Sequence, residues 1–395
     1  MIASLRLKNF LSYGPEGETV PLGALNVLIG PNGSGKSNLI EGIALLQSAP
    51  SRLDTPIREG GGVRDWLWKG TKEIPTATIE ALVELFPGTE GKLPLRYRLD
   101  FTASGGRFEI TDERIESTAP CSGHDGPFFY YRYEEGHPVL SVRDPEDERR
   151  RSRTLRREDV DPSRSILAQR RDPDIYPEIT RLGEVFGRMR IYRDWSLGRY
   201  TPPRLPQPAD LPNGWLEENG RNLGLVLNRL RRDSGAKSRL LEMFRAVYAE
   251  AEDFDVMVEG GTVQVFVQEG RFSVPATRLS DGTLRYLCLL AVLCDPTPPP
   301  LVCIDEPEIG LHPDLINHVA DALRLAAEKT QIVVTTHSTG LVDAFTNTPE
   351  VVLVCEKENF HTSVHRLDEG ALRPWLQQYG LGHLWTSGEI GGNRW

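Results

Sequence analysis

The stretch Leu25–Ser37, L-N-V-L-I-G-P-N-G-S-G-K-S, decides the fold of this chain. Its first five residues form an apolar run that predicts a buried strand, and Gly30–Ser37 fills every fixed position of the pattern GxxxxGK[ST]. The following residues, Asn38–Leu46, place apolar side chains at helical spacing. A strand, a glycine-rich turn and a helix in this order form a loop that binds nucleotide phosphates.

The residue types in this loop suit a triphosphate. Glycines let successive backbone N–H groups point inward, and the N-terminus of the following helix adds a partial positive charge. We expect Lys36 to reach the β- and γ-phosphates and the Ser37 hydroxyl to ligate Mg²⁺, so that ATP and Mg²⁺ are the predicted cofactors. The predicted nucleotide-binding residues of this segment are Gly30, Asn32, Gly33, Ser34, Gly35, Lys36, Ser37 and Asn38.

The composition is that of a folded protein without a generally basic surface. Of 395 residues 39% are hydrophobic, and the net charge is −10, which argues against indiscriminate nucleic-acid binding. The five cysteines show neither a CxxC pair nor metal-ligand spacing, which favours reduced thiols. The longest apolar run, Tyr286–Cys294, is too short to span a bilayer, and Met1–Phe10 lacks a signal-peptide core. We therefore expect a soluble, cytoplasmic protein with no membrane partner.

The periodicity predicts an α/β protein of three parts. Residues 1–135 are expected to form an N-terminal lobe in which the phosphate loop is joined by an antiparallel β subdomain, because four alternating stretches lie between residues 77 and 133. Residues 136–250 are expected to form an inserted, largely helical lobe with an Arg-rich loop and a Pro-rich connector. Residues 251–395 are expected to complete a mixed central sheet as the C-terminal lobe.

Six arginines lie between Arg149 and Arg157. One interpretation is a contact with nucleic acid or with a protein partner. The other is a solvated loop, because acidic residues flank the cluster and nearly cancel its charge. The charge balance favours the second interpretation, and the sequence leaves both open.

A second apolar run, Leu301–Ile304, ends in Asp305 and Glu306. Open α/β sheets bind their ligands at the carboxyl ends of the strands, so the run is expected to deliver both carboxylates to the nucleotide. Asp305 is the predicted Mg²⁺ residue and Glu306 the predicted residue that polarises the attacking water. In-line attack on a γ-phosphate depends mainly on such positioning and charge.

The chain resembles the ATP-binding-cassette (ABC) ATPases. It is most similar to their RecF/SMC-like branch, the stand-alone AAA family ATPases related to RecF and to OLD-type nucleases. The resemblance covers about residues 1–50 and 270–395. Its motifs are N-F near the start, G-P-N-G-S-G-K-S-N-L-I-E-G-I in the phosphate loop and its helix, L-S-D-G-T at Leu279–Thr283, I-D-E-P-E-I-G-L-H-P at Ile304–Pro313, T-T-H-S at Thr335–Ser338, and the ending Tyr379–Trp395. It implies a P-loop NTPase fold of the ABC-ATPase type.

The resemblance also implies roles for single residues. Ser280 and Gly282 would bind the γ-phosphate of an ATP held by a second subunit, so that a homodimer encloses two ATP molecules head to tail. Gly310–Pro313 would cross the dimer axis, and His337 would sense the γ-phosphate. Together with Lys36 and Glu306, His337 makes up the predicted catalytic set. Gln169 is a candidate for the glutamine that couples Mg²⁺ to the inserted lobe.

Some features depart from the family pattern. Asp281 and Thr283 replace the Gly and Gln of the transporter motif LSGGQ, and an aspartate beside a phosphate is unfavourable unless it points away. No long heptad run is present, so a coiled-coil rod is not expected. After His337 the remaining stretch is too short for the metal-dependent nuclease domain of OLD-type proteins, and His361, His365 and His383 do not form a convincing metal site.

Three functions are compatible with these motifs. The first is an ATP-driven switch that dimerises and acts on DNA in repair or genome maintenance. The second is the regulatory ATPase of an anti-phage defence system, a nucleotide-gated scaffold that restrains a separate effector, a nuclease or toxin, with little direct DNA binding. The third, a small-molecule phosphotransferase, is least supported because a kinase needs no signature motif. The negative net charge weakens the first hypothesis, and the lack of an effector domain favours the second.

Overall fold

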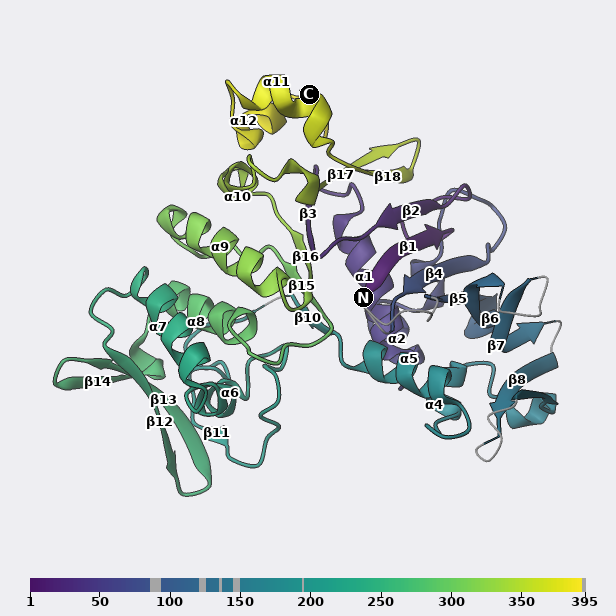
Figure 1. Cartoon of the computed structure of the whole chain (residues 1–395), viewed down its shortest axis with the longest axis horizontal. Helices are drawn as coiled ribbons and strands as arrows, with labels where there is room; N and C mark the ends of the chain where they lie inside the picture. Colours follow the sequence, from purple (N-terminus) through teal and green to yellow (C-terminus); the bar gives the residue numbers. More distant parts are fainter. Residues whose placement is uncertain (86–93, 121–125, 135–136, 145–149, 194, 393–395) are drawn as a thin grey trace.

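The computed structural model describes residues 1–395 apart from 86–93, 121–125, 135–136, 145–149, 194 and 393–395 (Figure 1). Its core is a six-stranded sheet in which five strands are parallel and the last is antiparallel. In spatial order the strands are β10 (Arg190–Tyr192), β15 (Leu301–Asp305), β16 (Gln331–Thr335), β3 (Leu25–Ile29), β17 (Val352–Glu358) and β18 (His361–Arg366). The phosphate-loop strand β3 is fully buried, as its mostly apolar sequence predicts, and the polar Asn26 within it is buried too.

A second, eight-stranded sheet is antiparallel throughout and lies beside the core sheet (Figure 1). In spatial order its strands are β2 (Glu18–Pro21), β1 (Ile2–Lys8), β4 (Ala77–Val83), β5 (Leu95–Ser104), β6 (Arg107–Pro120), β7 (Pro127–Glu134), β8 (His137–Arg143) and β9 (Arg150–Thr154). The predicted α/β class, with a mixed central sheet and an added antiparallel β subdomain, is confirmed. The four strands expected between residues 77 and 133 are present.

Helices cover both faces of the core sheet. Alternate side chains of β3 enter different cores: Val27 and Ile29 pack with α8 (Asp281–Leu293) and α9 (Ile316–Ala327), whereas Leu28 packs with α1 (Lys36–Ser48) and the antiparallel sheet. Figure 1 accordingly shows α1 on one side of the core sheet and α8 and α9 on the other. The phosphate-loop helix and the helix that follows the L-S-D-G-T motif therefore lie on opposite faces.

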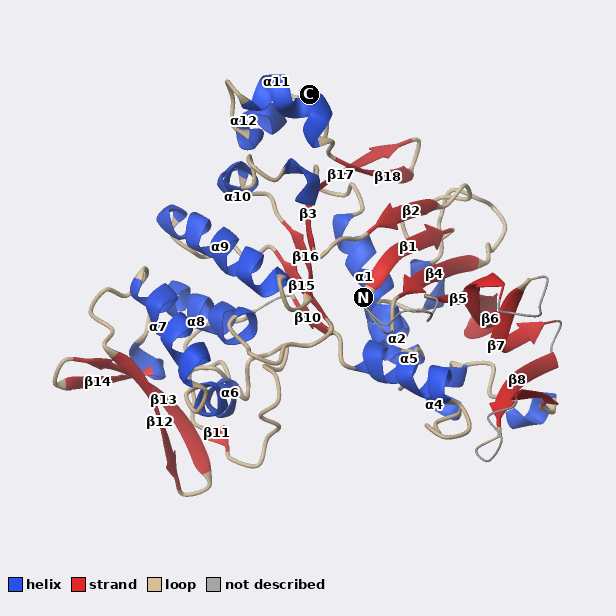
Figure 2. Cartoon of the chain, in the orientation of Figure 1, coloured by secondary structure: helices blue, strands red, loops and turns tan. Residues whose placement is uncertain are grey.

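The other helices and a small sheet surround this centre (Figure 2). The helices are α2 (Asp54–Glu59), α3 (Val63–Trp66), α4 (Ile166–Gln169), α5 (Pro177–Gly187), α6 (Leu223–Leu230), α7 (Ser234–Arg245), α10 (Thr339–Ala344), α11 (Glu369–Leu376) and α12 (Leu381–Thr386). The small sheet consists of β11 (Gln207–Pro208), β12 (Asp253–Glu259), β13 (Thr262–Glu269) and β14 (Phe272–Pro275). Within the described ranges no helix has the length and apolar character needed to cross a bilayer.

The structure differs from the sequence-based expectation in the segment after residue 135. Strands β8 and β9 extend the antiparallel sheet past that residue, and β10 belongs to the core sheet, so residues 136–250 are less helical than expected. Strand β9 consists of arginine, serine and threonine and therefore has no apolar alternation, and β10 has only three residues. Neither strand therefore gives a periodic signal.

Candidate nucleotide-binding site

The functional segments meet at one edge of the core sheet. Because β10, β15, β16, β3 and β17 run parallel, their carboxyl ends lie at the same edge. The phosphate loop follows β3, Glu306 follows β15, and Thr336 and His337 follow β16. Residues more than 300 positions apart in the sequence are brought together in this way, and the strand order alone accounts for it.

Two glycines shape the phosphate loop. Gly30 has a φ of 143°, and a Cβ there would lie 2.2 Å from the carbonyl oxygen of Cys355. Gly35 has a φ of 104°, and a Cβ there would lie 2.4 Å from Oγ1 of Thr362. Any side chain at either position would displace the hairpin formed by β17 and β18. The loop thus follows its path because it has no side chains where it touches that hairpin.

Neighbouring hydroxyl groups hold the loop in place. The Thr362 hydroxyl donates to the carbonyl oxygen of Ser34 at 2.8 Å, and the Tyr13 hydroxyl donates to that of Gly35 at 3.2 Å. The amide of Asn38 donates to Oγ of Ser12 at 2.7 Å. The Ser34 hydroxyl is buried and has no hydrogen-bond partner among the described residues. These contacts preorganise the loop for an anion.

Lys36 lies inside the loop and is only 5% exposed. Its Nζ donates to the carbonyl oxygens of Gly30 and Pro31 at 2.7 and 3.0 Å. Burial lowers the pKa of Lys36, whereas the carboxylates of Glu306 and Asp305 act in the opposite direction. The ammonium is thus held over the loop, where phosphate oxygens would replace two carbonyl oxygens as its partners.

The two predicted carboxylates sit at the end of β15 in different conformations. Asp305 accepts a hydrogen bond from the Thr335 hydroxyl. Glu306 has a left-handed backbone with a φ of 47°, and its N–H donates to the Thr335 carbonyl at 3.1 Å. Left-handed backbone is uncommon in residues other than glycine, and such strained residues gather at functional sites. A carboxylate oxygen of Glu306 lies 3.4 Å from Nε2 of His337.

The backbone around His337 is fixed by one further carboxylate. Oε1 of Glu308 accepts hydrogen bonds from the Thr336 hydroxyl at 2.5 Å and from the N–H groups of His337 and Ser338 at 3.0 and 3.2 Å. Burial, with a smaller contribution from the positive charge of Lys36, lowers the pKa of His337, while Glu306 opposes this. The imidazole is therefore largely neutral at pH 7 and can accept a proton or a hydrogen bond.

The segment after β10 belongs to the same edge, although sequence reasoning missed it. Arg193 and Trp195 line a cavity of about 260 Å³ together with Asp305, Glu306 and Arg285. One guanidinium nitrogen of Arg193 and the indole nitrogen of Trp195 are buried and lack hydrogen-bond partners among the described residues. The only sequence signal for this segment is the short run R-I-Y before it, which is too brief to predict a core strand.

This segment also connects two helices. Arg193 donates to Glu41 of α1 at 2.6 Å, and Arg285 of α8 donates to the Trp195 carbonyl at 3.0 Å. It therefore touches α1 on one face of the sheet and α8, the helix that begins within the L-S-D-G-T motif, on the other. Gln169, the candidate for such a coupling role, instead makes hydrogen bonds with Asp161 and Arg164 in the loop before α4.

The L-S-D-G-T motif caps α8. The Ser280 hydroxyl accepts a hydrogen bond from the Thr283 N–H at 3.0 Å, which is typical of an N-cap serine. A Cβ on Gly282 would lie 2.9 Å from the carbonyl oxygen of Gly310, so the motif packs against the loop that follows β15. Because α8 and α1 lie on opposite faces of the sheet, the structure does not bring Ser280 and the phosphate loop of one chain together.

Asp281 is turned toward a buried arginine. Arg204 is 5% exposed, forms an ion pair with Asp281, and donates to the carbonyl oxygens of Leu197, Ala276 and Leu279. The guanidinium thus both orients the carboxylate and fixes the backbone just before the motif. The negative charge of Asp281, which would be unfavourable beside a phosphate, is thus paired with Arg204.

A cavity of about 550 Å³ lies beside the first turn of α1. Leu11, Leu67, Trp68 and Phe360 give it an apolar and aromatic lining, and Asn38 connects it to the phosphate loop. The Trp68 indole N–H donates to the Phe360 carbonyl at 3.1 Å and joins two segments far apart in the sequence. The size and lining suit a base beside its phosphates.

Comparison with known proteins identifies the family of the chain. Residues 25–343 match the family model described as "AAA domain, putative AbiEii toxin, Type IV TA system". The match covers most of the chain, and the chain therefore belongs to this family of P-loop ATPase domains. The resemblance to RecF/SMC-like and OLD-type ATPases is confirmed at this level.

One relative is similar to the chain in sequence, and two solved structures are similar to it in fold. An alignment of 164 residues with the Old nuclease of Escherichia phage P2 is 29% identical and covers 37% of this chain but only 27% of that protein. An SmcHead bound to the C-winged helix domain of ScpA has a TM-score of 0.59 at 15% identity, covering 94% of this chain and 99% of that one. A Pyrococcus furiosus Smc head domain has a TM-score of 0.55 at 14% identity, covering 95% and 98%. At such identities the likeness shows the fold alone, an ABC-type P-loop fold similar to SMC heads.

Proposed function

We propose that this chain is an ATPase that dimerises head to tail around two ATP molecules. The observation that carries the proposal is the placement of α1 and α8 on opposite faces of one sheet. The phosphate loop holds one side of a triphosphate, and the exposed N-terminus of α8, capped by Ser280, offers an anion site to a triphosphate held elsewhere. A second copy of the chain supplies the missing half for each ATP.

The residues at the sheet edge suit hydrolysis within this assembly. Ser37 and Asp305 present the hard oxygen ligands that Mg²⁺ prefers, and the bound ion would neutralise charge on the phosphate oxygens. Lys36 binds the β- and γ-phosphates. Glu306 orients the attacking water and acts as the general base that accepts its proton. His337, whose Nε2 lies 3.4 Å from a Glu306 carboxylate oxygen, contacts the γ-phosphate. Asn32, Gly33, Ser34 and Asn38 complete the phosphate contacts, and Gly282 lets α8 approach.

We further propose that the closed dimer controls a separate effector in a defence or toxin system. The family description names a toxin of a toxin–antitoxin system, and the phage relative is named a nuclease, which support a role beside an effector. The alternative, a dimerising switch that acts on DNA in repair or genome maintenance, draws on the fold shared with Smc heads.

A variant that binds but does not hydrolyse ATP tests the proposal. Glu306→Gln removes the carboxylate that polarises water while keeping the shape of the side chain, so the ATP-bound dimer should accumulate. Light scattering should then report a doubled mass with ATP and a monomer without it. Adding Ser280→Arg to this variant places a bulky cation on the signature and should restore the monomer with ATP binding intact. A Glu306→Gln protein that stays monomeric in ATP, or a double variant that still dimerises, contradicts the proposal.

A further inference from the structure

The antiparallel sheet splits open between two of its outer strands. Strand β7 pairs with β8 from Glu134 and His137 as far as Tyr131 and Leu140, and there the ladder ends. Strand β8 continues to pair with β9, up to Arg143 opposite Arg150. The first half of β7 therefore diverges from the β8–β9 pair and leaves a wedge-shaped opening between them.

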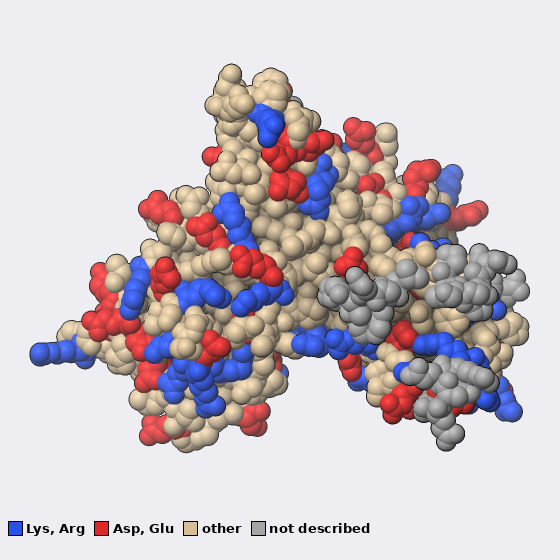
Figure 3. All heavy atoms as spheres, in the orientation of Figure 1, with Lys and Arg blue, Asp and Glu red and all other residues tan. Residues whose placement is uncertain are grey.

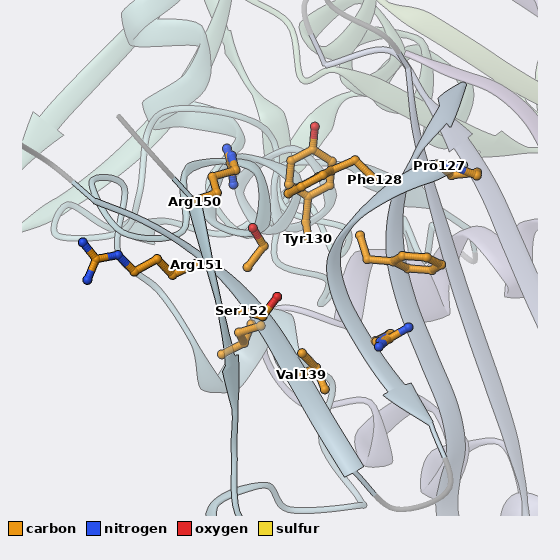
Figure 4. A pocket seen from close by; sticks show the side chains of 11 residues that line it. Pro127, Phe128, Tyr130, Val139, Arg150, Arg151 and Ser152 are labelled. Atoms are coloured by element: carbon orange, nitrogen blue, oxygen red, sulfur yellow. The ribbon is translucent and has the colours of Figure 1, made fainter. Parts of the chain in front are cut away.

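A cavity of about 610 Å³ occupies this wedge (Figure 4). One wall is the beginning of β7 and the other is formed by β8 and β9, which carry the arginines that the sequence analysis singled out. Arg149, the first of that cluster, lies outside the described residues, whereas Arg150 and Arg151 line the cavity. We refer to this cavity as the wedge pocket, and its rings and guanidinium groups come from Phe128, Phe129, Tyr130, Arg132, Arg150 and Arg151.

The aromatic and cationic groups of the wedge pocket are already stacked on one another. The guanidinium carbon of Arg150 lies 5.6 Å from the ring centre of Phe128 and 5.1 Å from that of Tyr130. The two rings stand edge to face, with centres 5.1 Å apart. Arg132 covers the ring of Phe129 at 5.4 Å. Planar groups therefore form the surface that a ligand would meet.

The cationic groups are held in place while part of their capacity remains unused. Arg150 pairs with Glu178 of α5 at 2.5 Å, and its Nη1 is buried without a hydrogen-bond partner among the described residues. The Arg151 side chain is 75% exposed and lies 3.6 Å from Asp144, a loose ion pair that a phosphate oxygen can replace. The β9 wall thus offers positive charge next to the aromatic rings of β7.

We propose that the wedge pocket binds a nucleobase and its adjacent phosphate, as presented by single-stranded nucleic acid. Aromatic rings and arginine planes are the surfaces on which unpaired bases stack, and arginines bind phosphates with two parallel hydrogen bonds. A base in a duplex is stacked on both faces and paired through its edge. A single strand is therefore the form whose base can enter a pocket. The split in the sheet provides the opening.

The proposal agrees with the overall charge of the molecule. The chain carries a net charge of −10, and on the face shown in Figure 3 lysines and arginines are interspersed with acidic residues. The described part of this face therefore does not present the broad positive surface that binds a duplex. A small pocket that combines stacking with two or three arginines needs no such surface.

The binding test uses the full chain and a fluorescein-labelled 15-nucleotide thymidine strand, with a duplex of the same length for comparison. Fluorescence anisotropy at low salt should show binding of the strand and at least roughly tenfold weaker binding of the duplex. Binding should persist in Lys36→Ala, which separates the wedge pocket from the ATP site. No binding of the strand, or equal affinity for the duplex, overturns the proposal.

Matched variants assign the binding to the wedge pocket. Tyr130→Leu removes a stacking ring and Arg151→Ala removes a phosphate ligand, and each should weaken binding roughly tenfold. Phe272→Leu, an exposed ring on β14, and Arg153→Ala, an exposed arginine on the same strand as Arg151, should leave it unchanged. Equal effects of test and control variants contradict the proposal.

A spectroscopic readout and a competitor complete the test. A strand with one 2-aminopurine should lose fluorescence on binding to the wild type and to Tyr130→Phe, which keeps the ring, but not to Tyr130→Leu. Thymidine monophosphate competing as well as the strand supports the same pocket with a free nucleotide as its ligand. Weaker competition supports a strand that contacts more than one phosphate. Unchanged fluorescence with the wild type overturns stacking.

Discussion

Glu113 shows how the surroundings of one residue set its chemistry. This carboxyl group is 2% exposed and accepts hydrogen bonds from the hydroxyls of Ser165 and Tyr97 and from the N–H of Ile166. Burial raises the pKa of Glu113 from 4.5 to about 7, and the three donors only partly oppose it. The group therefore keeps its proton in the folded protein at a pH at which the unfolded chain has lost it.

The stability of the protein should depend on pH through this residue. Between pH 4.5 and 7 the folded state binds more protons at Glu113 than the unfolded state does, so the free energy of unfolding falls as pH rises. Relative to Glu113→Gln, the wild type should lose up to roughly 3 kcal/mol from pH 4.5 to pH 8. Urea denaturation of both proteins across this range measures the difference. Glu109→Gln on the same strand serves as the control, and wild-type and Glu113→Gln curves that stay parallel contradict the assignment.

At the scale of elements, the start of α8 depends on a residue far from it in the sequence. Arg204 binds three carbonyl oxygens and the carboxylate of Asp281, so it holds the backbone that presents Ser280. A buried carbonyl that loses its donor costs about 1–3 kcal/mol, and Arg204→Met would leave three of them without this donor. The L-S-D-G-T motif would then be less well positioned to contact an ATP molecule bound to a partner.

Arg204→Met should therefore weaken ATP-driven dimerisation more than nucleotide binding. In the Glu306→Gln background, the protein concentration for half-dimerisation should rise at least about tenfold, while ATP affinity of the monomer changes less than about twofold. Sedimentation velocity measures the first quantity, and fluorescence of a labelled ATP analogue measures the second. Arg199→Met, an exposed arginine of the same loop, is the control. Equal losses in both quantities would point to general unfolding.

How much of the fold and of the site could be predicted from the sequence depends on the length and apolar pattern of each strand. The position of the phosphate loop, Asp305, Glu306 and His337 at one edge could be predicted because each lies at or just after the end of a five-residue, mostly apolar strand, and parallel strands end at one edge. Arg193 could not be predicted, because the strand before it has only three residues and joins the core sheet by pairing with β15. The wedge pocket depends on where a ladder stops, and the partner of Asp281 lies 77 positions away.

At the scale of the whole molecule, the core sheet separates the phosphate loop and α1 from α8 with its L-S-D-G-T motif. The phosphate loop and α1 belong to one face, with the antiparallel sheet beyond it, and α8 with the small sheet belongs to the other (Figure 1). Within one chain the L-S-D-G-T motif and the phosphate loop therefore lie on opposite sides of the core sheet. In the proposed dimer, two copies related by a twofold axis would form two identical composite sites, each from the phosphate loop of one copy and the L-S-D-G-T motif of the other.

Mixing two inactive variants tests this arrangement most directly. Lys36→Ala lacks the ammonium that opposes the triphosphate, and Ser280→Ala lacks the hydroxyl proposed to contact a partner's γ-phosphate without adding bulk that would prevent dimerisation, so each alone should hydrolyse ATP well below the wild-type rate. In a mixed dimer both defects fall in one composite site, and the other site joins an intact phosphate loop to an intact signature. Random pairing should restore up to about a quarter of the wild-type rate per chain. An equimolar mixture that hydrolyses ATP no faster than the average of its two components would contradict the shared site.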